Sequence, residues 1–358
     1  MNSEIITDIN YRNGRTGLSG RSGRRSRRKR SLPGGFLVIL LVLLAAAGLI
    51  LFTGWKKYGD LFRDRYDMKT RPGALLTKEA PPASLSAFGG DLAVVRSASD
   101  DDSTVGAQGV FLCREGVPDA FFAKHAFDHM NPASTTKILT CLLALENGDP
   151  NEIWTAGPEI HPDEPDASMA GFKEGDRVTM LQVLYGLMLP SGADSANMIA
   201  LHIGGSNEAF IEMMNRRAEE IGAVDTHFTN THGLTDQEHY SSPYDLYLIL
   251  REAMKNETFR AIAGCPQYRA EYLDAAGNPV TKNWKNTNYF LNGKASILDG
   301  YEVAGGKTGT TLAAGACLAL AARDGEGNLY YSIVLKSAKH STLYPDVNAV
   351  LEKIPRQH

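Results

Sequence analysis

Residues 131–137 read Asn-Pro-Ala-Ser-Thr-Thr-Lys and run into the apolar stretch 138–143, Ile-Leu-Thr-Cys-Leu-Leu. This segment predicts a helix that opens near Ser134. A spacing of three residues then places the side chains of Ser134 and Lys137 on one face, one turn apart. A serine hydroxyl beside an amine that can accept its proton is the minimal arrangement of an activated nucleophile. Taken alone the spacing is common, because a serine in this place can simply cap a helix.

Two further short motifs follow Ser134 in the chain. Residues 191–193 read Ser-Gly-Ala and lie 57 residues after Ser134, between patterns of helical spacing at 178–188 and 194–203. Residues 307–309 read Lys-Thr-Gly and precede small apolar residues, so we expect them at the start of a strand. A serine–lysine pair, a loop serine and a Lys-Thr-Gly, in this order, form the arrangement of penicillin-binding proteins and serine β-lactamases.

On these motifs the chain resembles the D-alanyl-D-alanine carboxypeptidases among the low-molecular-mass penicillin-binding proteins, the S11 serine peptidases. The likeness covers residues 108–356 and includes Gly-acid-x-Val-Thr…Leu-Pro-Ser-Gly in 175–192 and His-Gly-Leu at 232–234. It implies an α+β domain of the β-lactamase/transpeptidase type, in which helices flank an antiparallel sheet and form a helical subdomain. The residue pattern agrees, because strand-like segments near both ends enclose several helical ones. The predicted strands are 109–113, 120–123 and the pair 313–322 and 330–336. The predicted helices are 134–147, 178–188, 194–203, 207–221, 245–254 with Ser241 or Ser242 as its cap, and a short closing helix at 345–354.

The resemblance assigns the acylation chemistry to three residues. Ser134 would attack the penultimate D-Ala carbonyl of a peptidoglycan stem peptide that ends in D-Ala-D-Ala. Lys137 would be the general base, which requires a neutral amine; burial and the charge of Lys307 would both lower its pKa. Ser191 would pass the proton to the departing D-Ala nitrogen. The acyl-enzyme would be released by water in a carboxypeptidase or by an amine in a transpeptidase, and a β-lactam would trap the same serine.

The third motif would bind the substrate. Lys307 and Thr308 would hold its terminal carboxylate, and Gly309 would let the substrate strand lie close against the backbone. The backbone N–H groups of Ser134 and Thr310 would form the oxyanion hole. The resemblance implies no cofactor, and none of the nine histidines has the spacing of a zinc site, so we expect no metal.

One position departs from the family pattern. The second motif is usually Ser-x-Asn, whereas residue 193 is alanine. The amide that would bind the substrate backbone and help to position Lys137 is missing, and Asn197, one helical turn later, is a poor substitute. We therefore expect a working acylation site with altered peptide affinity or slow turnover. Asp194 is interpreted as a cap of the following helix, and His232 as structural.

Two other functions remain open. A β-lactamase shares the serine and the lysine but needs a carboxylate that activates the hydrolytic water, typically in a Glu-x-x-Leu-Asn segment. No such segment lies between 194 and 306. A non-catalytic peptidoglycan-binding or sporulation scaffold would suit Ala193, but it has no need of an intact Ser134 and Lys137.

Charge is distributed unevenly along the chain. Residues 1–57 hold eleven basic and two acidic residues, which leaves 26 basic and 39 acidic residues for the rest. Segment 34–54 carries no charge and would span roughly 30 Å as a helix, enough for a bilayer core. Because nine basic residues precede it, we expect a single-pass anchor in the cell membrane with a cytoplasmic N-terminus and an extracytoplasmic catalytic domain. A signal peptide cleaved near residues 45–47 is the alternative.

The organisation of the remaining chain follows from this anchor. The arginine-rich tail is interpreted as a topology signal that meets anionic lipid, so we expect no nucleic-acid partner. The segment after the anchor is rich in turn-forming and charged residues and contains a possible short strand at 91–96. The chain ends at His358, before the β-rich domain and amphipathic helix of many relatives, so segment 34–54 would provide the anchoring. The predicted parts are a basic tail at 1–33, the anchor at 34–54, a tether at 55–105 and the peptidase domain at 106–358.

Four cysteines in an exported protein could pair as disulfides. Three of them lie among apolar neighbours at scattered spacings, which favours buried free thiols. The cysteines are Cys113, Cys141, Cys265 and Cys317.

Overall fold

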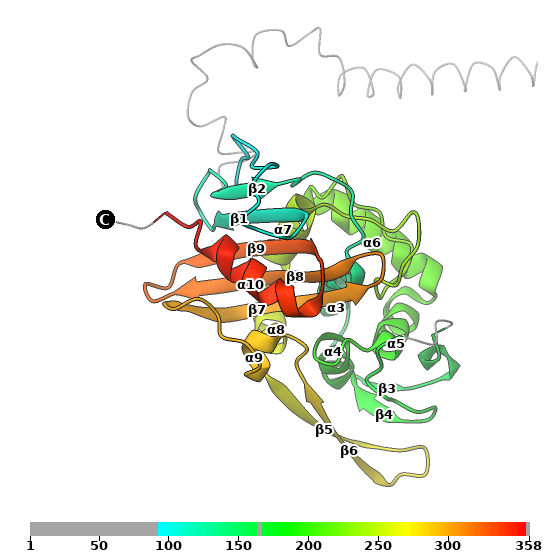
Figure 1. Ribbon diagram of the computed structural model, residues 1–358. Helices are drawn as coiled ribbons and strands as arrows, with labels where there is room; N and C mark the ends of the chain where they lie inside the picture. The colour runs from blue at the N-terminus through cyan, green and yellow to red at the C-terminus, as the bar shows by residue number, and fades with distance from the viewer. Residues whose placement is uncertain (1–91, 163–166, 356–358) are drawn as a thin grey trace, which may run out of the picture. The chain divides into compact units, whose positions relative to one another are not determined.

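A five-stranded antiparallel sheet forms the centre of the fold (Figure 1). The computed structural model describes residues 92–162 and 167–355. The strand order is β2-β1-β9-β8-β7, so strands from both ends of the described chain pair side by side. The segments 313–322 and 330–336, predicted as paired strands, form β8 and β9. The strands are β1 (Gly109–Arg114), β2 (Phe122–Lys124), β7 (Tyr301–Thr311), β8 (Gly315–Asp324) and β9 (Leu329–Ser337).

Both faces of this sheet are covered, which explains the unbroken run of small apolar residues in β8. Leu318 and Leu320 belong to the hydrophobic cluster that helix α10 (His340–Leu351) covers. Ala319 and Ala321 belong to the larger cluster on the opposite face, shared with the central helices. A strand buried on both faces needs apolar side chains at every position.

The central helices pack around α3. Helix α3 begins at Lys137, and its residues 137–144 are all buried. A 3-10 turn over Ala133–Thr136, labelled η1, leads into it. Ser242 caps α7 by accepting a hydrogen bond from the backbone N–H of Asp245, in line with the sequence pattern. The helices are α3 (Lys137–Asn147), α4 (Met180–Met188), α5 (Ala193–Gly204), α6 (Asn207–Ile221), α7 (Pro243–Ala253), α8 (Glu257–Ala263) and α9 (Tyr289–Asn292).

A second, four-stranded antiparallel sheet was not predicted from the sequence. Its β5–β6 hairpin alternates mostly polar side chains, and only Ala270, Tyr272 and Trp284 are buried. The Trp284 indole N–H donates to the backbone oxygen of Ala170 at 2.9 Å, which ties the hairpin to a loop of the helical region. Figure 1 shows the hairpin projecting away from the main sheet. The strands are β3 (Ile153–Thr155), β4 (Arg177–Thr179), β5 (Gln267–Leu273) and β6 (Pro279–Lys285).

Two predicted boundaries near the C-terminus are wrong. Lys307 lies in the middle of β7, because the preceding residues from Tyr301 already pair with β8. The last helix begins at His340 and contains Pro345 in its interior, although proline usually opens a helix. The start of this helix is held by Thr342, whose Oγ1 accepts a hydrogen bond from the backbone N–H of the cap residue Lys339 at 3.2 Å.

Residues 92–105, predicted as part of the tether, pack against the folded domain. Ala93 and Val105 are buried. The phenol of Tyr244 donates to the backbone oxygen of Ala93 at 3.0 Å, which fixes this segment on α7. The predicted strand at 91–96 is reduced to one isolated bridge between Val94 and Asp119.

The predicted basic tail, the apolar segment 34–54 and the first part of the tether lie outside the described residues. Within the ranges that the structure describes, no helix combines the length and the apolar character needed to cross a membrane. All four cysteines are free thiols, and Cys265 is the most exposed of them.

Candidate active site

The serine and lysine of the first motif meet across the 3-10 turn that opens α3. Ser134 lies within the turn and Lys137 is the first residue of the α-helix, so the predicted single helix is in fact divided here. In a 3-10 turn side chains at i and i+3 lie directly above one another. The Nζ of Lys137 is 3.0 Å from the Oγ of Ser134. The geometry required for an activated nucleophile is therefore present.

The turn is held in a strained conformation by its own hydroxyl groups. Ala133, just before the nucleophile, has a φ of 47°, which is unusual for a residue with a Cβ. Thr135 Oγ1 donates to the oxygen of Pro132 at 2.7 Å, and Thr136 Oγ1 donates to that of Ala133 at 2.9 Å. His239 Nε2 lies 2.9 Å from Thr136 Oγ1 and forms a hydrogen bond with this hydroxyl. These bonds fix the direction in which Ser134 points.

The backbone carbonyl of His232 completes this centre, which the sequence analysis missed. It accepts a hydrogen bond from Lys137 Nζ at 2.5 Å and lies 3.4 Å from Ser134 Oγ. Gly233 has a φ of 84°, and a Cβ there would fall 1.9 Å from the oxygen of Ala133. The His-Gly pair thus packs directly on the nucleophile turn. The imidazole is structural, as predicted. The role of the carbonyl could not be predicted from the sequence, because every residue type has the same backbone oxygen.

Both lysines of the site are buried, and this changes their protonation. Lys137 is 2 % exposed, and burial, with a smaller effect from the charge of Lys307, holds its pKa well below the usual range. These are the two causes expected from the sequence. Asp194 acts in the opposite direction. Burial also lowers the pKa of Lys307 to about 7. A neutral Lys137 amine can accept the Ser134 proton over the 3.0 Å that separate them.

Strand β7 places the third motif beside the nucleophile turn. Lys307 Nζ donates to the oxygen of Thr308 at 2.9 Å, and Thr308 Oγ1 lies 2.6 Å from Thr287 Oγ1. A Cβ on Gly309 would fall 2.9 Å from the backbone nitrogen of Ser134. The glycine is therefore required by the nucleophile turn itself, which is a different reason from the substrate approach predicted. Thr310, the next residue, is exposed.

Ser191 lies in the loop between α4 and α5, as predicted, in an uncommon conformation. Its φ is 67°, and it is 6 % exposed. Its Oγ is one of the few buried side-chain oxygens in the described part of the chain without a hydrogen-bond partner. Strained backbone and unpaired hydroxyls of this kind gather at functional sites.

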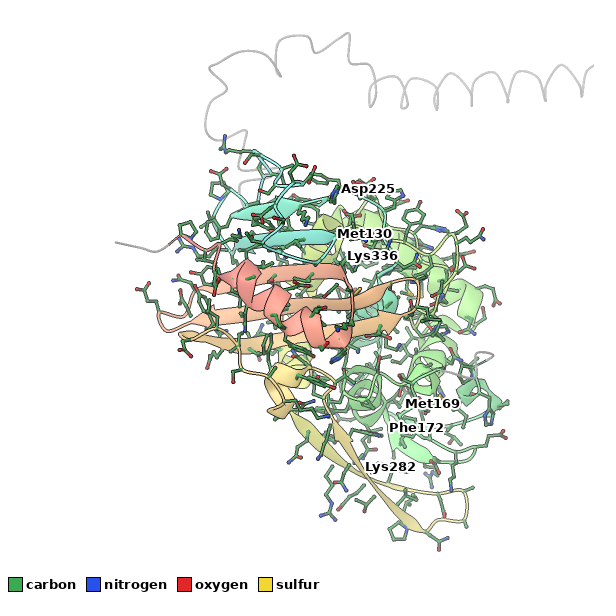
Figure 2. All side chains as sticks on the ribbon, in the orientation of Figure 1. Met130, Met169, Phe172, Asp225, Lys282 and Lys336 are labelled. Carbon is green, nitrogen blue, oxygen red and sulfur yellow. The ribbon has the colours of Figure 1, made fainter. Side chains whose placement is uncertain are left out.

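The residues after Ser191 serve structure rather than chemistry. As expected of a cap, the Asp194 carboxylate accepts the backbone N–H of Ser195 in the first turn of α5 at 2.9 Å. It also accepts backbone N–H groups of the separate segment 170–172, at 2.7 to 3.2 Å, which the sequence did not predict. The Asn197 amide donates to the oxygen of Glu159 at 3.0 Å, so it does not replace the missing amide at Ala193. Figure 2 shows Met169, just before the segment held by Asp194, and Phe172, its last residue, beside α4 and α5 and above Lys282 of β6.

Comparisons with known proteins point to one family. The sequence profile of the peptidase S11 family, D-alanyl-D-alanine carboxypeptidase, matches residues 99–338. The chain is 32% identical over 259 residues to the D-alanyl-D-alanine carboxypeptidase of Streptomyces sp. strain K15, covering 69% of this chain and 87% of that protein. It is 33% identical over 224 residues to DacF of Bacillus subtilis, covering 61% of this chain but only 54% of DacF. The crystal structure of the Streptomyces K15 DD-transpeptidase matches with a TM-score of 0.65 at 32% identity, over 70% of this chain and 98% of that one.

Proposed function

Since the chain belongs to the peptidase S11 family and is a serine D-Ala-D-Ala peptidase of peptidoglycan, we propose that it removes the terminal D-Ala of stem peptides through an acyl-enzyme on Ser134. The observation that carries this assignment is the contact of 3.0 Å between Ser134 Oγ and the buried Nζ of Lys137. A lysine whose pKa burial holds well below its usual range is suited to be the base that this serine needs.

The proposed proton path runs from Ser134 through Lys137 and Ser191 to the leaving group. As Ser134 Oγ bonds to the carbonyl carbon of the penultimate D-Ala, its proton passes to the Lys137 amine. Ser191 relays that proton to the amide nitrogen of the leaving D-Ala as the C–N bond breaks. The unpaired Ser191 Oγ supports this role, because no protein group competes for its hydrogen bond in the described chain. Water, or an amine in transpeptidation, then attacks the ester.

Strand β7 recognises the substrate end. Lys307 and Thr308 bind the terminal carboxylate, and this anion would favour the charged form of Lys307, whose pKa burial lowers to about 7. The N–H groups of Ser134 and Thr310 receive the oxyanion. The close approach of Gly309 to the Ser134 nitrogen supports this pairing, because Thr310 is the next residue along the strand. Each such donor typically contributes about 3 kcal/mol to the transition state.

Two measurements test the assignment. A fluorescent penicillin should label the wild-type protein and leave Ser134→Ala unlabelled, and mass spectrometry should locate the adduct on Ser134. Diacetyl-L-Lys-D-Ala-D-Ala should release free D-Ala. Labelling of Ser134→Ala equal to wild type would contradict the nucleophile. Loss of the penicillin adduct within seconds would favour a β-lactamase, and absence of both reactions would favour a scaffold.

The membrane anchor is also part of the proposal. The uncharged segment 34–54 and the basic residues before it support a single span with the catalytic domain outside the cytoplasm. Expressed at full length, the protein should stay in the membrane fraction after alkaline carbonate extraction. Release of a shorter, mature chain into the medium would instead indicate a cleaved signal peptide.

A further inference from the structure

Thr287, between strand β6 and helix α9, contacts both sides of the catalytic centre (Figure 1). Its Oγ1 lies 2.6 Å from the Oγ1 of Thr308 in β7. Its backbone N–H donates to the oxygen of Leu189 at 3.1 Å, and Leu189 lies two positions before Ser191. Thr287 belongs to none of the three motifs, and the mechanism proposed above gives it no role. It nevertheless joins the strand of the carboxylate site to the loop of the proton relay.

The backbone of Thr287 is held on both sides by buried asparagines. Asn286 is 4 % exposed, and its amide donates to the backbone oxygen of Cys265 at 2.9 Å. The backbone oxygen of Asn286 accepts the amide of Asn292 at 2.8 Å. Asn288 is fully buried and caps α9. Because its neighbours are anchored in this way, Thr287 can hold Thr308 and Leu189 at a set separation.

The direction of the hydrogen bond between the two threonines depends on the substrate. Without a ligand, either hydroxyl can donate to the other. A carboxylate only accepts hydrogen bonds, and a hydroxyl has a single proton to donate. Once Thr308 donates to the substrate carboxylate, its contact with Thr287 persists only if Thr287 is the donor. The proton of Thr287 therefore leaves that of Thr308 free for the anion, where the hydrogen bond is charge-assisted.

The two contacts of Thr287 correspond to the two ends of the leaving D-Ala. In the proposed mechanism, the carboxylate of this residue binds Thr308 and its nitrogen takes a proton from Ser191. One Cα separates the two groups, so the nitrogen and the carboxylate carbon are about 2.5 Å apart. Both protein groups must therefore be correctly spaced for one small residue. Thr287 is bonded to Thr308 and to the loop of Ser191, so it is suited to maintain this spacing.

We propose that Thr287 is a positioning residue for the leaving D-Ala. Its hydroxyl donates to Thr308, which then donates to the terminal carboxylate, and its backbone N–H keeps this site aligned with Ser191. The proposal rests on the proposed function and adds to it a residue that controls recognition of an anionic carboxyl terminus. The hydroxyl of Thr287, and not its methyl group, is the part that this recognition requires.

The first experiment compares two β-lactams that differ in one charge. Benzylpenicillin carries a carboxylate, and its methyl ester does not. Thr287→Val keeps the side-chain shape and the backbone N–H but removes the hydroxyl. It should lower the second-order acylation rate constant about fivefold to tenfold for benzylpenicillin, as loss of one hydrogen bond would, and less than twofold for the ester. The half-saturating concentration of benzylpenicillin should rise while the limiting acylation rate stays unchanged.

Two further variants separate the hydroxyl from folding. Thr287→Ser restores the hydroxyl and should return the benzylpenicillin-to-ester ratio to within twofold of wild type. Thr287→Ala also lacks the hydroxyl and should lower the ratio as Thr287→Val does. Partial unfolding reduces both rates equally and leaves the ratio unchanged. Thr281→Val, at an exposed threonine of β6, is the matched control and should alter neither rate.

A double-mutant cycle tests whether Thr287 acts through Thr308. Thr308→Val removes the hydroxyl that binds the anion. In that background, Thr287→Val should cause less than a twofold further loss with benzylpenicillin, because its effect needs the Thr308 hydroxyl. Losses that multiply would show that Thr287 supports the fold in general, and would overturn the positioning role.

The remaining outcomes distinguish this proposal from the proposed function. Equal losses for benzylpenicillin and its ester in Thr287→Val, or no recovery in Thr287→Ser, would overturn the role of Thr287. Release of D-Ala from diacetyl-L-Lys-D-Ala-D-Ala should fall in Thr287→Val by the same factor as benzylpenicillin acylation. If the wild-type protein is acylated by benzylpenicillin but releases no D-Ala, the carboxypeptidase assignment fails. The ratio between the two β-lactams still decides the role of Thr287 in that case.

Discussion

The two sides of the catalytic centre differ in how completely their polar groups are hydrogen-bonded. On the side of β7 and the 3-10 turn, the polar groups are paired: Lys137 contacts both Ser134 Oγ and the His232 carbonyl, and Gly309 packs against the Ser134 backbone. On the side of α5, Ser191 is strained and its hydroxyl is unpaired. The amide expected next to it is replaced by Ala193.

In the proposed mechanism, this difference separates two stages of the reaction. Nucleophile activation depends on the paired side, whose geometry exists before any substrate arrives. Proton transfer to the leaving group and alignment of the peptide depend on the α5 side, which gains its missing partners only from substrate. The comparison therefore predicts rapid acylation by a reactive β-lactam and less efficient turnover of peptides, because the peptide has to supply its own alignment.

The largest expected effect tests the paired side. Lys137→Ala removes the base and should slow acylation by penicillin roughly 10³-fold, within the usual range for general base catalysis. Lys285→Ala, an exposed lysine of β6, is the matched control and should leave the rate unchanged. Stopped-flow measurement of the acylation rate constant checks this. A loss below tenfold would show that another group, such as Ser191, activates the serine.

Burial of Lys307 should have a cost in stability. Its pKa of about 7 in the folded protein lies below the ordinary 10.5, so unfolding takes up a proton between these values and stability falls as pH decreases from 10.5 to 7. Lys307→Met should therefore be more stable at pH 7 by about 4 kcal/mol, while losing carboxypeptidase activity.

Urea unfolding of the wild-type protein and Lys307→Met at pH 7 and pH 9.5 measures this difference. The advantage of the variant should be smaller at the higher pH, where the unfolded lysine gains less from its proton. A variant that is less stable than the wild type at both pH values would mean that Lys307 is held by interactions beyond its bond to Thr308.

A substitution at Gly233 tests how closely the loop with the His232 carbonyl must pack on the 3-10 turn that contains Ser134. Both Gly233 and Gly205 have positive φ, but only at Gly233 would a Cβ collide, 1.9 Å from the Ala133 oxygen. Gly233→Ala should displace the His232 carbonyl and lower the acylation rate about 10²-fold, as misplacement near 1 Å does. Gly205→Ala should cost about 1 kcal/mol of stability with unchanged acylation. Equal rates in the two variants would contradict the positioning role of this loop.

The sequence predicted the reactive side chains of the centre better than the groups that hold them in place, for a physical reason. Ser134, Lys137 and Lys307 are recognisable because the chemistry needs those side chains. The His232 carbonyl is a backbone group that any residue supplies, and the carboxylate of Asp194 reaches a segment more than twenty positions earlier in the chain.

The same reasoning explains what was found and missed in the fold. Strand β8 and helix α6 have apolar patterns that report burial directly. The β5–β6 hairpin carries mostly polar side chains, and its few buried ones, such as Trp284, are fixed by partners distant in the chain. Local periodicity cannot show such partners, whereas the motifs and their order identified the family.

Restoring the missing amide at position 193 should improve peptide turnover relative to acylation by penicillin. Ala193→Asn places an acceptor and two donors where the family usually has them, and should raise kcat/KM for a D-Ala-D-Ala peptide about tenfold, the worth of one good hydrogen bond to substrate. Ala193→Leu, of similar size but without polar atoms, is the control and should not improve turnover. The penicillin acylation rate should change less than the peptide rate in Ala193→Asn. An equal gain for both substrates would indicate that the amide acts on Lys137 and not on the peptide.

The smallest expected effect concerns Asn197. Its amide lies four residues after Ala193 in the sequence, but it already donates a hydrogen bond to the backbone oxygen of Glu159. Its bond to the Glu159 oxygen should contribute about 1 kcal/mol to stability. Asn197→Leu should therefore lower the free energy of unfolding by that amount, while D-Ala release from the diacetylated peptide changes less than twofold. Thermal unfolding and steady-state kinetics on the same preparation measure both. If turnover fell tenfold with stability preserved, Asn197 would be serving the reaction in place of the absent amide, and the contrast between the two sides would be smaller than the geometry indicates.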